Sequence, residues 1–374
     1  MSRIALGIVG AGRIVRQAYL MILPLIECIG EVLLYDLDRS KADAVIEAYD
    51  SWLLESAFAK EHGHQFEDAQ NRAARLRRKL SVSMSLDDVV RRSDAVLVST
   101  PPSSHLQIAQ ACLDAGALTL IEKPLAVSSI AAREFAHRNK SLLERVRYLE
   151  NYVHNPAFQR VKRMIDDGTF GSPLLISVFL SKTLPTGSSD SWRLNPLESG
   201  GGVLSDWGSH TFGLALYLAG QGCKVISVRA ESVHFIPRSC PPVESYALTS
   251  IFTEAKSGRP LTLLVENSWE CGMEKSAPSG FWVSIALTGG TIRIDQKLTG
   301  GTKEYFIRAA RHDAEAISTR MPSEFTHDSF YYSLLDSFQP RPSPYASFSF
   351  GLKILDIIDE SRYGEYSTRS EDRG

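Results

Sequence analysis

Several features that define common protein classes are missing from this sequence of 374 residues. The charges nearly balance, with 41 Lys and Arg against 43 Asp and Glu, so the basic excess typical of nucleic-acid-binding proteins is absent. The cysteines form no C-x-x-C pair, which argues against a structural zinc site or a disulfide framework and favours a reducing compartment. They are scattered at Cys28, Cys112, Cys223, Cys240 and Cys271. We therefore expect neither nucleic acid nor a metal ion as a partner.

Long hydrophobic runs are missing as well. The longest run beyond the N-terminal region, residues 19–26, contains Pro24 and is far shorter than the ~20 residues of a bilayer-spanning helix. The apolar run at residues 4–9 is cut short by Gly10 and Gly12, so it does not match a secretory signal. These features predict a soluble, cytoplasmic protein with no membrane partner.

What is present is the composition of a globular protein, with 44% hydrophobic and 22% charged residues. At about 150 residues per domain, the length suggests roughly two domains. The first 150 residues alternate short apolar runs with helical patterns, which predicts βαβ units and a doubly wound parallel sheet. The expected strands are 3–9, 31–36, 94–99, 118–121 and 146–153. The expected helices are 13–29, 103–115 and 128–143, and residues 40 to about 79 are mostly helix-forming with an interruption at Gly63.

The second half has a different pattern and predicts an α+β domain, so we place one domain at 1–150 and another at 151–374. Several long strand-like runs separated by turn residues predict one large, mainly antiparallel sheet with an open face. Its expected strands are 174–184, 224–235, 245–252, 261–267, 281–287 and 291–294. Helices are expected at 156–167, 203–218, 323–338 and 347–362, with a loop at 186–202.

A possible phosphate-binding turn lies between the first strand and the first helix. Gly10 permits a tight turn, and Gly12 lets the backbone approach a pyrophosphate at the start of the helix, next to Arg13 and Ile14. The third glycine of the G-x-G-x-x-G pattern is replaced by Val15, which weakens the match but leaves the phosphate contact intact. The strand–turn–helix context makes a dinucleotide site the favoured interpretation.

An acidic residue at the end of the second strand supports this interpretation. Asp36 lies where a carboxylate would hydrogen-bond the ribose hydroxyls and repel a 2′-phosphate, so it favours NAD over NADP. Arg39 nearby leaves NADP possible. The alternative is an ordinary strand–helix turn with an acidic residue that caps the helix.

Two further motifs follow the next two strands. Thr100, Pro101 and His105 belong to a T-P-P-S-S-H segment, and Glu122 and Lys123 belong to an E-K-P segment. The carboxyl ends of strands border the ligand crevice of a doubly wound sheet. A surface ion pair is the ordinary interpretation of Glu122 and Lys123, but after a nucleotide fold the lysine is a candidate acid or base.

The last motif is a glycine-rich segment at residues 200–210. Asp206 and His210 are four residues apart, so on a helix they share one face, where a carboxylate can orient a histidine and raise its basicity. A helix with a capping acid and a packed histidine is the alternative for this pair alone.

Together these motifs resemble the glucose–fructose oxidoreductase / inositol 2-dehydrogenase / MocA (Gfo/Idh/MocA) family over nearly the whole chain. N-P-A-F at 155–158 and W-R at 192–193 extend the match. The resemblance implies a Rossmann domain, an open-faced α/β domain, and catalysis by Lys123, Asp206 and His210. It implies NAD or NADP as cofactor and hydride transfer at a hydroxyl or ketone of a sugar or cyclitol. Additional candidate substrate contacts are His154, Trp192 and Arg193.

Some positions depart from the family pattern and leave the substrate open. They are Val15, Val153 ahead of the N-P motif, Gly213 after the histidine, and an insertion-like stretch at 51–75. Other activities seen on this fold remain alternatives: NAD-dependent glycoside cleavage by transient oxidation, imine reduction, and ligand sensing without catalysis. An exposed sheet face predicts a homodimer or homotetramer.

Overall fold

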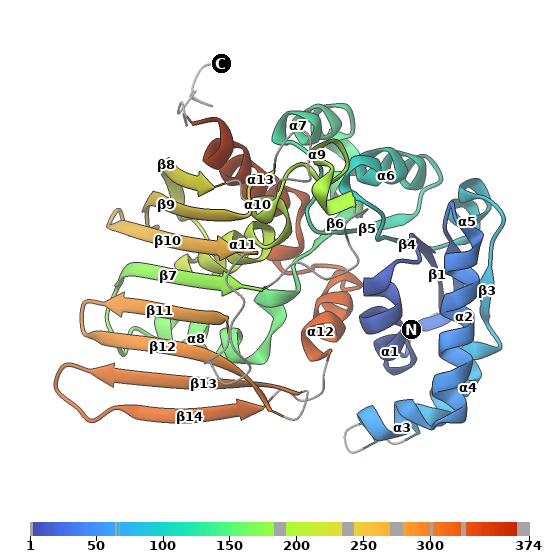
Figure 1. Cartoon of the computed structure of the whole chain (residues 1–374), viewed down its shortest axis with the longest axis horizontal. Helices are drawn as coiled ribbons and strands as arrows, with labels where there is room; N and C mark the ends of the chain where they lie inside the picture. Colours follow the sequence, from blue (N-terminus) through green and yellow to red (C-terminus); the bar gives the residue numbers. More distant parts are fainter. Residues whose placement is uncertain are drawn as a thin grey trace. The chain divides into compact units, whose positions relative to one another are not determined.

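The computed structural model describes residues 3–63, 66, 68–182, 192–233, 243–269, 280–299, 302–322 and 327–364. Its contacts form two compact units (Figure 1). The first unit comprises Met1–Ala126, Ile130–Asn151 and Glu324–Gly351, and the second comprises Val127–Ser129, Tyr152–Ser323 and Leu352–Gly374. A single boundary after residue 150 therefore misses the return of the chain to the first unit. Cys240, Cys271 and the predicted strand ends at 183–184 and 234–235 lie outside the described residues.

The first unit contains a six-stranded sheet in the order β3-β2-β1-β4-β5-β6, with every neighbouring pair parallel. This is the doubly wound order of a Rossmann fold, so the predicted fold is confirmed. The strands are β1 (Ile4–Val9), β2 (Ile29–Tyr35), β3 (Leu80–Val82), β4 (Ala95–Val98), β5 (Leu118–Glu122) and β6 (Val146–Leu149). The sequence analysis missed β3, which has only three residues.

Helices lie on both faces of this sheet, as its buried apolar strands require. One core contains residues of α2 (Arg39–Leu54), α3 (Ala57–His62) and α4 (Ala69–Arg77). The other core contains residues of α5 (Leu86–Arg92) and α6 (His105–Asp114). Further elements of the unit are α7 (Ser129–Arg138), α12 (Asp328–Ser337) and 3-10 turns at Pro102–Ser104, Lys140–Arg145 and Pro344–Ala346. The helix α5 was not predicted.

Several predicted elements of the first unit have different bounds. The helical stretch expected from 40 to about 79 forms three separate helices, α2, α3 and α4, and the first break comes already after Leu54. The expected helix at 13–29 ends at Leu25, because Pro24 leads into a 3-10 turn and Ile29 already belongs to β2. It consists of a π-helical stretch, Val15–Tyr19, followed by α1 (Leu20–Ile22) and the turn Leu23–Leu25. The expected strand at 146–153 ends at Leu149, and a 3-10 turn follows at Asn151–His154.

The second unit is built on an eight-stranded sheet in the order β14-β13-β12-β11-β7-β10-β9-β8. Only β7 and β10 run parallel among its neighbouring pairs, which confirms the predicted, mainly antiparallel sheet. Its first four strands along the chain are β7 (Pro173–Ser181), β8 (Lys224–Val233), β9 (Tyr246–Glu254) and β10 (Pro260–Ser268). They are followed by β11 (Phe281–Leu287), β12 (Gly290–Thr299), β13 (Thr302–Arg311) and β14 (Ile317–Pro322). The last two strands were not predicted.

Helices cover one face of this sheet (Figure 1). They include α8 (Pro156–Asp166) and α11 (Gly208–Ala219), while α9 (Pro196–Ser199), α10 (Val203–Asp206) and α13 (Phe348–Tyr363) complete the unit. Along β9, β10 and β11, buried residues alternate with more accessible ones, as expected when one sheet face carries the core. No helix among the described residues is long and apolar enough to span a membrane.

Candidate active site

In the first unit, strand register brings four of the predicted motifs to one edge of the sheet. Val9 pairs with both Tyr35 and Val98, and Val98 pairs with Ile121. The paired residues form one row across the sheet. The segments that follow them therefore all leave the sheet at the same level of its carboxyl edge. This is the edge at which open α/β sheets bind their ligands.

The glycine turn fits a bound dinucleotide. Gly10 has φ of +95°, and a Cβ there would lie 2.7 Å from the carbonyl oxygen of Ser99, so only glycine fits between these loops. A Cβ on Gly12 would meet nothing within 4 Å, which leaves open space beside the backbone for a ligand. The helical turns begin directly after Gly12. Arg13 is exposed and Ile14 half-buried at this start.

Val15 occupies the position of the third glycine of the pattern, and the local structure accommodates it. Val15 is fully buried and opens the π-helical stretch Val15–Tyr19. A valine needs more room between helix and strand than a glycine does, and a π-helix is wider than an α-helix. The altered residue therefore coincides with an altered helix, while Gly10 and Gly12 keep the turn.

Asp36 lies beside this turn with both carboxylate oxygens engaged by the backbone. One oxygen accepts a hydrogen bond from the Ala11 amide at 2.8 Å, and the other accepts from the Asp38 amide at 2.9 Å. The carboxylate thus holds the glycine turn against the end of β2. Arg39 lies on the first turn of α2 and pairs with Asp43 at 3.4 Å.

His105, a predicted cofactor contact, has its side chain inside the first unit. Its ring is completely buried, with Nδ1 2.9 Å from the Pro124 carbonyl oxygen and Nε2 2.8 Å from the Thr100 carbonyl oxygen. Burial lowers the pKa of His105 below its ordinary value, while the hydrogen bonds to the Thr100 and Pro124 carbonyl oxygens act in the opposite direction. His105 therefore joins the segment around Thr100 and Pro101 to the segment around Lys123 and Pro124.

Glu122 is also buried rather than open to a ligand. Its carboxylate accepts hydrogen bonds from the Tyr19 hydroxyl and, at 2.9 Å, from the Lys123 amide. Burial raises the pKa of Glu122 above its ordinary value, while the Tyr19 hydroxyl and the Lys123 charge act in the opposite direction. The half-buried Lys123 follows at the carboxyl end of β5, where it was predicted. Tyr19 was missed because it lies 103 residues away in the sequence.

In the second unit, Asp206 and His210 lie one turn apart at the junction of α10 and α11. Both side chains are largely buried. Arg193, a predicted substrate contact, places its Nε 3.6 Å from Asp206 Oδ2. The guanidinium of Arg193 also lies over the Trp192 ring, 4.4 Å from its centroid. These contacts join three of the predicted residues of this unit, Trp192, Arg193 and Asp206, and a fourth, His210, follows one turn after Asp206.

An aromatic residue that the sequence analysis missed contacts the histidine. The ring of Tyr152 stacks on that of His210, with centroids 4.5 Å apart and planes inclined by 11°. Its position just before the N-P-A-F motif was the only available signal. His154, two residues on, is buried at the end of the same turn. Stacking restricts the plane of the imidazole and so limits the directions in which its nitrogens can act.

Comparison with protein-family models supports both units. Residues 4–150 match the model described as "Oxidoreductase family, NAD-binding Rossmann fold", and residues 158–293 match the "GFO/IDH/MocA C-terminal domain". The chain belongs to the Gfo/Idh/MocA family. Together the matches include the glycine turn, the E-K-P segment and the pair Asp206 and His210.

The following three proteins are similar to this chain at limited sequence identity. The levoglucosan dehydrogenase of Pseudarthrobacter phenanthrenivorans is 31% identical over 35% of this chain and 34% of its own length. The inositol 2-dehydrogenase of Rhizobium meliloti is 23% identical over 44% of this chain and 48% of its own. The chain therefore matches less than half the length of either relative. A solved 3-ketoreductase from Actinomadura kijaniata, in complex with NADP and TDP-benzene, covers 97% of this chain and 98% of its own. Its TM-score is 0.68 at 18% identity, which shows a shared fold.

Proposed function

We propose that this protein is an NAD(P)-dependent oxidoreductase that acts on a secondary hydroxyl or ketone of a sugar, sugar derivative or cyclitol. The observation that carries the proposal is the row at the carboxyl edge of the first sheet. The glycine turn follows β1, Asp36 follows β2, and the lysine follows β5, and these strands share one register across β4. A bound nicotinamide would accept or supply the hydride at the reacting carbon.

The protein's own residues would handle the proton and the charge on oxygen. In the oxidative direction, His210 removes the hydroxyl proton, and Lys123 donates a hydrogen bond to the same oxygen as negative charge develops there. In reduction, His210 returns the proton. Asp206 orients His210, and Tyr152 fixes the ring plane by stacking. Arg193 forms an ion pair with the Asp206 carboxylate.

The substrate class rests on the relatives. Levoglucosan and inositol, named in two of them, are cyclic compounds with several secondary hydroxyl groups. Trp192 offers an aromatic surface that suits the apolar face of such a ring, and Arg193 and His154 are candidate donors to its hydroxyl groups. Asp36 favours NAD, because a carboxylate at the ribose repels a 2′-phosphate.

A linked activity screen tests the proposal. Sugars, sugar phosphates, nucleotide sugars and inositols are supplied with NAD or NADP, and absorbance of the reduced nicotinamide is followed in both directions. Net reduction with at least one polyol is the expected result. Glycoside cleavage without net nicotinamide reduction would instead identify a hydrolase that uses transient oxidation, and ligand binding without any turnover would identify a sensor.

We also propose that the open face of the second sheet joins copies of the chain. On this face Phe252 of β9 is 41% exposed, and Leu264, Phe179 and Trp282, which the strand register places on the same face, are half-buried. Exposed apolar patches of this kind mark interfaces. Light scattering should therefore give the mass of a dimer or tetramer, and a monomer at micromolar concentration would contradict this.

A further inference from the structure

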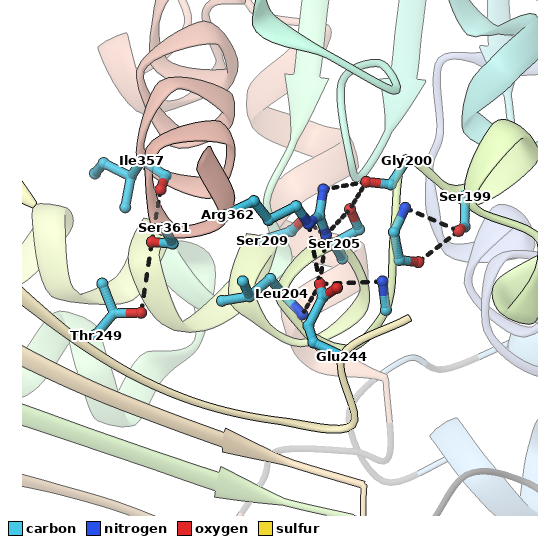
Figure 2. A network of polar contacts seen from close by, with 12 residues as sticks. Ser199, Gly200, Leu204, Ser205, Ser209, Glu244, Thr249, Ile357, Ser361 and Arg362 are labelled. Atoms are coloured by element: carbon cyan, nitrogen blue, oxygen red, sulfur yellow. Dashed lines mark hydrogen bonds and ion pairs between the residues drawn. The ribbon is translucent and has the colours of Figure 1, made fainter. Parts of the chain in front are cut away.

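A buried ion pair in the second unit contacts the glycine segment that precedes Asp206 and His210 (Figure 2). Arg362 of α13 places its Nη2 2.5 Å from Oε1 of Glu244, and the two side chains are only 12% and 5% exposed. Neither residue belongs to a motif identified in the sequence. Both residues lie far from the glycine segment in the sequence, so only the fold brings them into contact with it.

Glu244 accepts hydrogen bonds from the backbone amides at the start of α10. Its Oε1 accepts hydrogen bonds from the amides of Gly202 at 3.0 Å and Leu204 at 3.2 Å. Its main-chain oxygen accepts from the Val203 amide at 2.8 Å. The residue at the N-cap position, Gly202, has no side chain that could cap the helix. A carboxylate from a distant part of the chain therefore accepts the hydrogen bonds that an N-cap side chain would otherwise accept.

Arg362 holds the other side of the same segment. It donates to the Gly200 carbonyl oxygen and, at 3.0 Å, to the Ser205 hydroxyl. The Ser205 hydroxyl in turn donates to the Gly200 carbonyl at 2.9 Å. Ser209 donates to the Ser205 carbonyl at 2.6 Å. The residues directly before Asp206 and directly before His210 are thus tied into one network (Figure 2).

The three consecutive glycines are explained by this arrangement. A Cβ on Gly201 would lie 2.1 Å from Nη2 of Arg362, and one on Gly202 would lie 2.0 Å from the main-chain oxygen of Glu244. A Cβ on Gly200 would lie 2.7 Å from the carbonyl oxygen of Val127. The backbone therefore packs directly onto the ion pair, with no side chains between them to absorb a change.

We propose that Glu244 and Arg362 are positioning residues that hold Asp206 and His210 in their working geometry. This inference rests on the proposed function, because it assigns the pair a role through these two residues. The short helix α10 has four residues, so its placement depends on tertiary contacts more than on its own hydrogen bonds. We call the ion pair of Glu244 and Arg362 the clamp. Loss of the clamp should shift the side chains of Asp206 and His210 together.

The test uses the full chain and the best polyol substrate from a screen that includes myo-inositol and levoglucosan. The variants are Arg362→Lys, whose single ammonium group cannot reproduce the planar fork, and the double variant Glu244→Gln/Arg362→Gln, which leaves no unpaired buried charge. Ser361→Ala is the matched control. Ser361 neighbours Arg362 on α13 and is also buried, but it contacts Thr249 and Ile357 instead of the glycine segment.

Both clamp variants should lower kcat by at least about tenfold, since displacements near 1 Å can cost about a hundredfold. Affinity for NAD or NADP should stay within about twofold of wild type by fluorescence titration, because the glycine turn lies in the other unit. Hydrogen exchange should quicken in the peptide containing residues 200–210, and Ser361→Ala should change none of these values. A merely structural role predicts that kcat recovers in the double variant as its stability recovers.

His210→Asn, measured alongside, separates the two ways of failing. If His210→Asn keeps wild-type turnover, or if no substrate is turned over, the proposed function fails and the positioning role fails with it. If His210→Asn loses turnover while both clamp variants keep wild-type kcat, only the positioning role is overturned.

Discussion

The buried contact between Tyr19 and Glu122 makes a quantitative prediction for Tyr19→Phe. The substitution keeps the ring, which packs edge-on against Phe330 at 5.5 Å, and removes only the hydroxyl that donates to the carboxylate. A hydrogen bond to a charged group contributes about 1.5–3 kcal/mol. Because Glu122 is buried, water does not readily replace the lost donor. We expect the first unit to lose stability of this order near neutral pH.

The pH dependence of that loss follows from the pKa of Glu122. Burial raises this pKa in the folded state, so the group favours folding below the ordinary carboxyl pKa, and that contribution is lost as pH rises through the folded value. The Tyr19 hydroxyl lowers the pKa and so limits the loss. In Tyr19→Phe the pKa of Glu122 rises further. The difference from wild type should therefore be smallest near pH 4 and grow toward pH 8.

The matched control is Tyr49→Phe. Tyr49 is also fully buried, but its hydroxyl donates to the neutral Ala73 carbonyl at 3.1 Å. This variant should lose about 1 kcal/mol with no pH dependence between pH 4 and 8. Denaturant unfolding of the full chain, with hydrogen exchange of the β5 amides as a probe of the first unit, measures both. Equal, pH-independent losses in the two variants would refute the argument.

Three further predictions concern the cofactor site and the sheet. Asp36→Asn should narrow the preference for NAD over NADP by at least about tenfold, measured as the ratio of the two kcat/KM values; an unchanged ratio would contradict the assigned role. His105→Ala should weaken NAD binding and lower the free energy of unfolding by about 1–3 kcal/mol, because it removes the side chain that links the loops at Thr100 and Pro124. If calorimetry instead gives wild-type affinity, the link does not shape the site. Phe252→Glu should reduce the oligomer to a smaller species in light scattering, and an unchanged mass would exclude this face as the interface.

Strong local patterns predicted most of the fold. The buried strands near the N-terminus read as continuous apolar runs, and the alternating strands of the second half read as a half-exposed sheet. Short or polar elements were missed, since β3 has three residues and β14 contains mostly accessible ones. The return of α12 to the first unit could not be predicted. It depends on long-range packing, which includes the contact of Phe330 with Tyr19 and the burial of Leu334 in the first core, and no local pattern encodes such packing.

The candidate site was predicted to the extent that motifs mark it. Strand ends placed Asp36 and Lys123 correctly, because register carries them to one edge. The motifs of His105 and Glu122 did not reveal that both side chains are buried in the protein, and their cofactor contact stays a prediction. Tyr152 stacks on a catalytic candidate without belonging to any recognisable motif.

The most direct test of the central claim is the rate of hydride transfer in a single turnover. Nicotinamide absorbance would be followed with the best polyol in wild type, Lys123→Ala and His210→Asn, each saturated with cofactor. The account predicts a fall of about 10²–10⁴-fold for His210→Asn and a large fall for Lys123→Ala, with cofactor affinity retained in the histidine variant. Near-wild-type rates in both variants would contradict it.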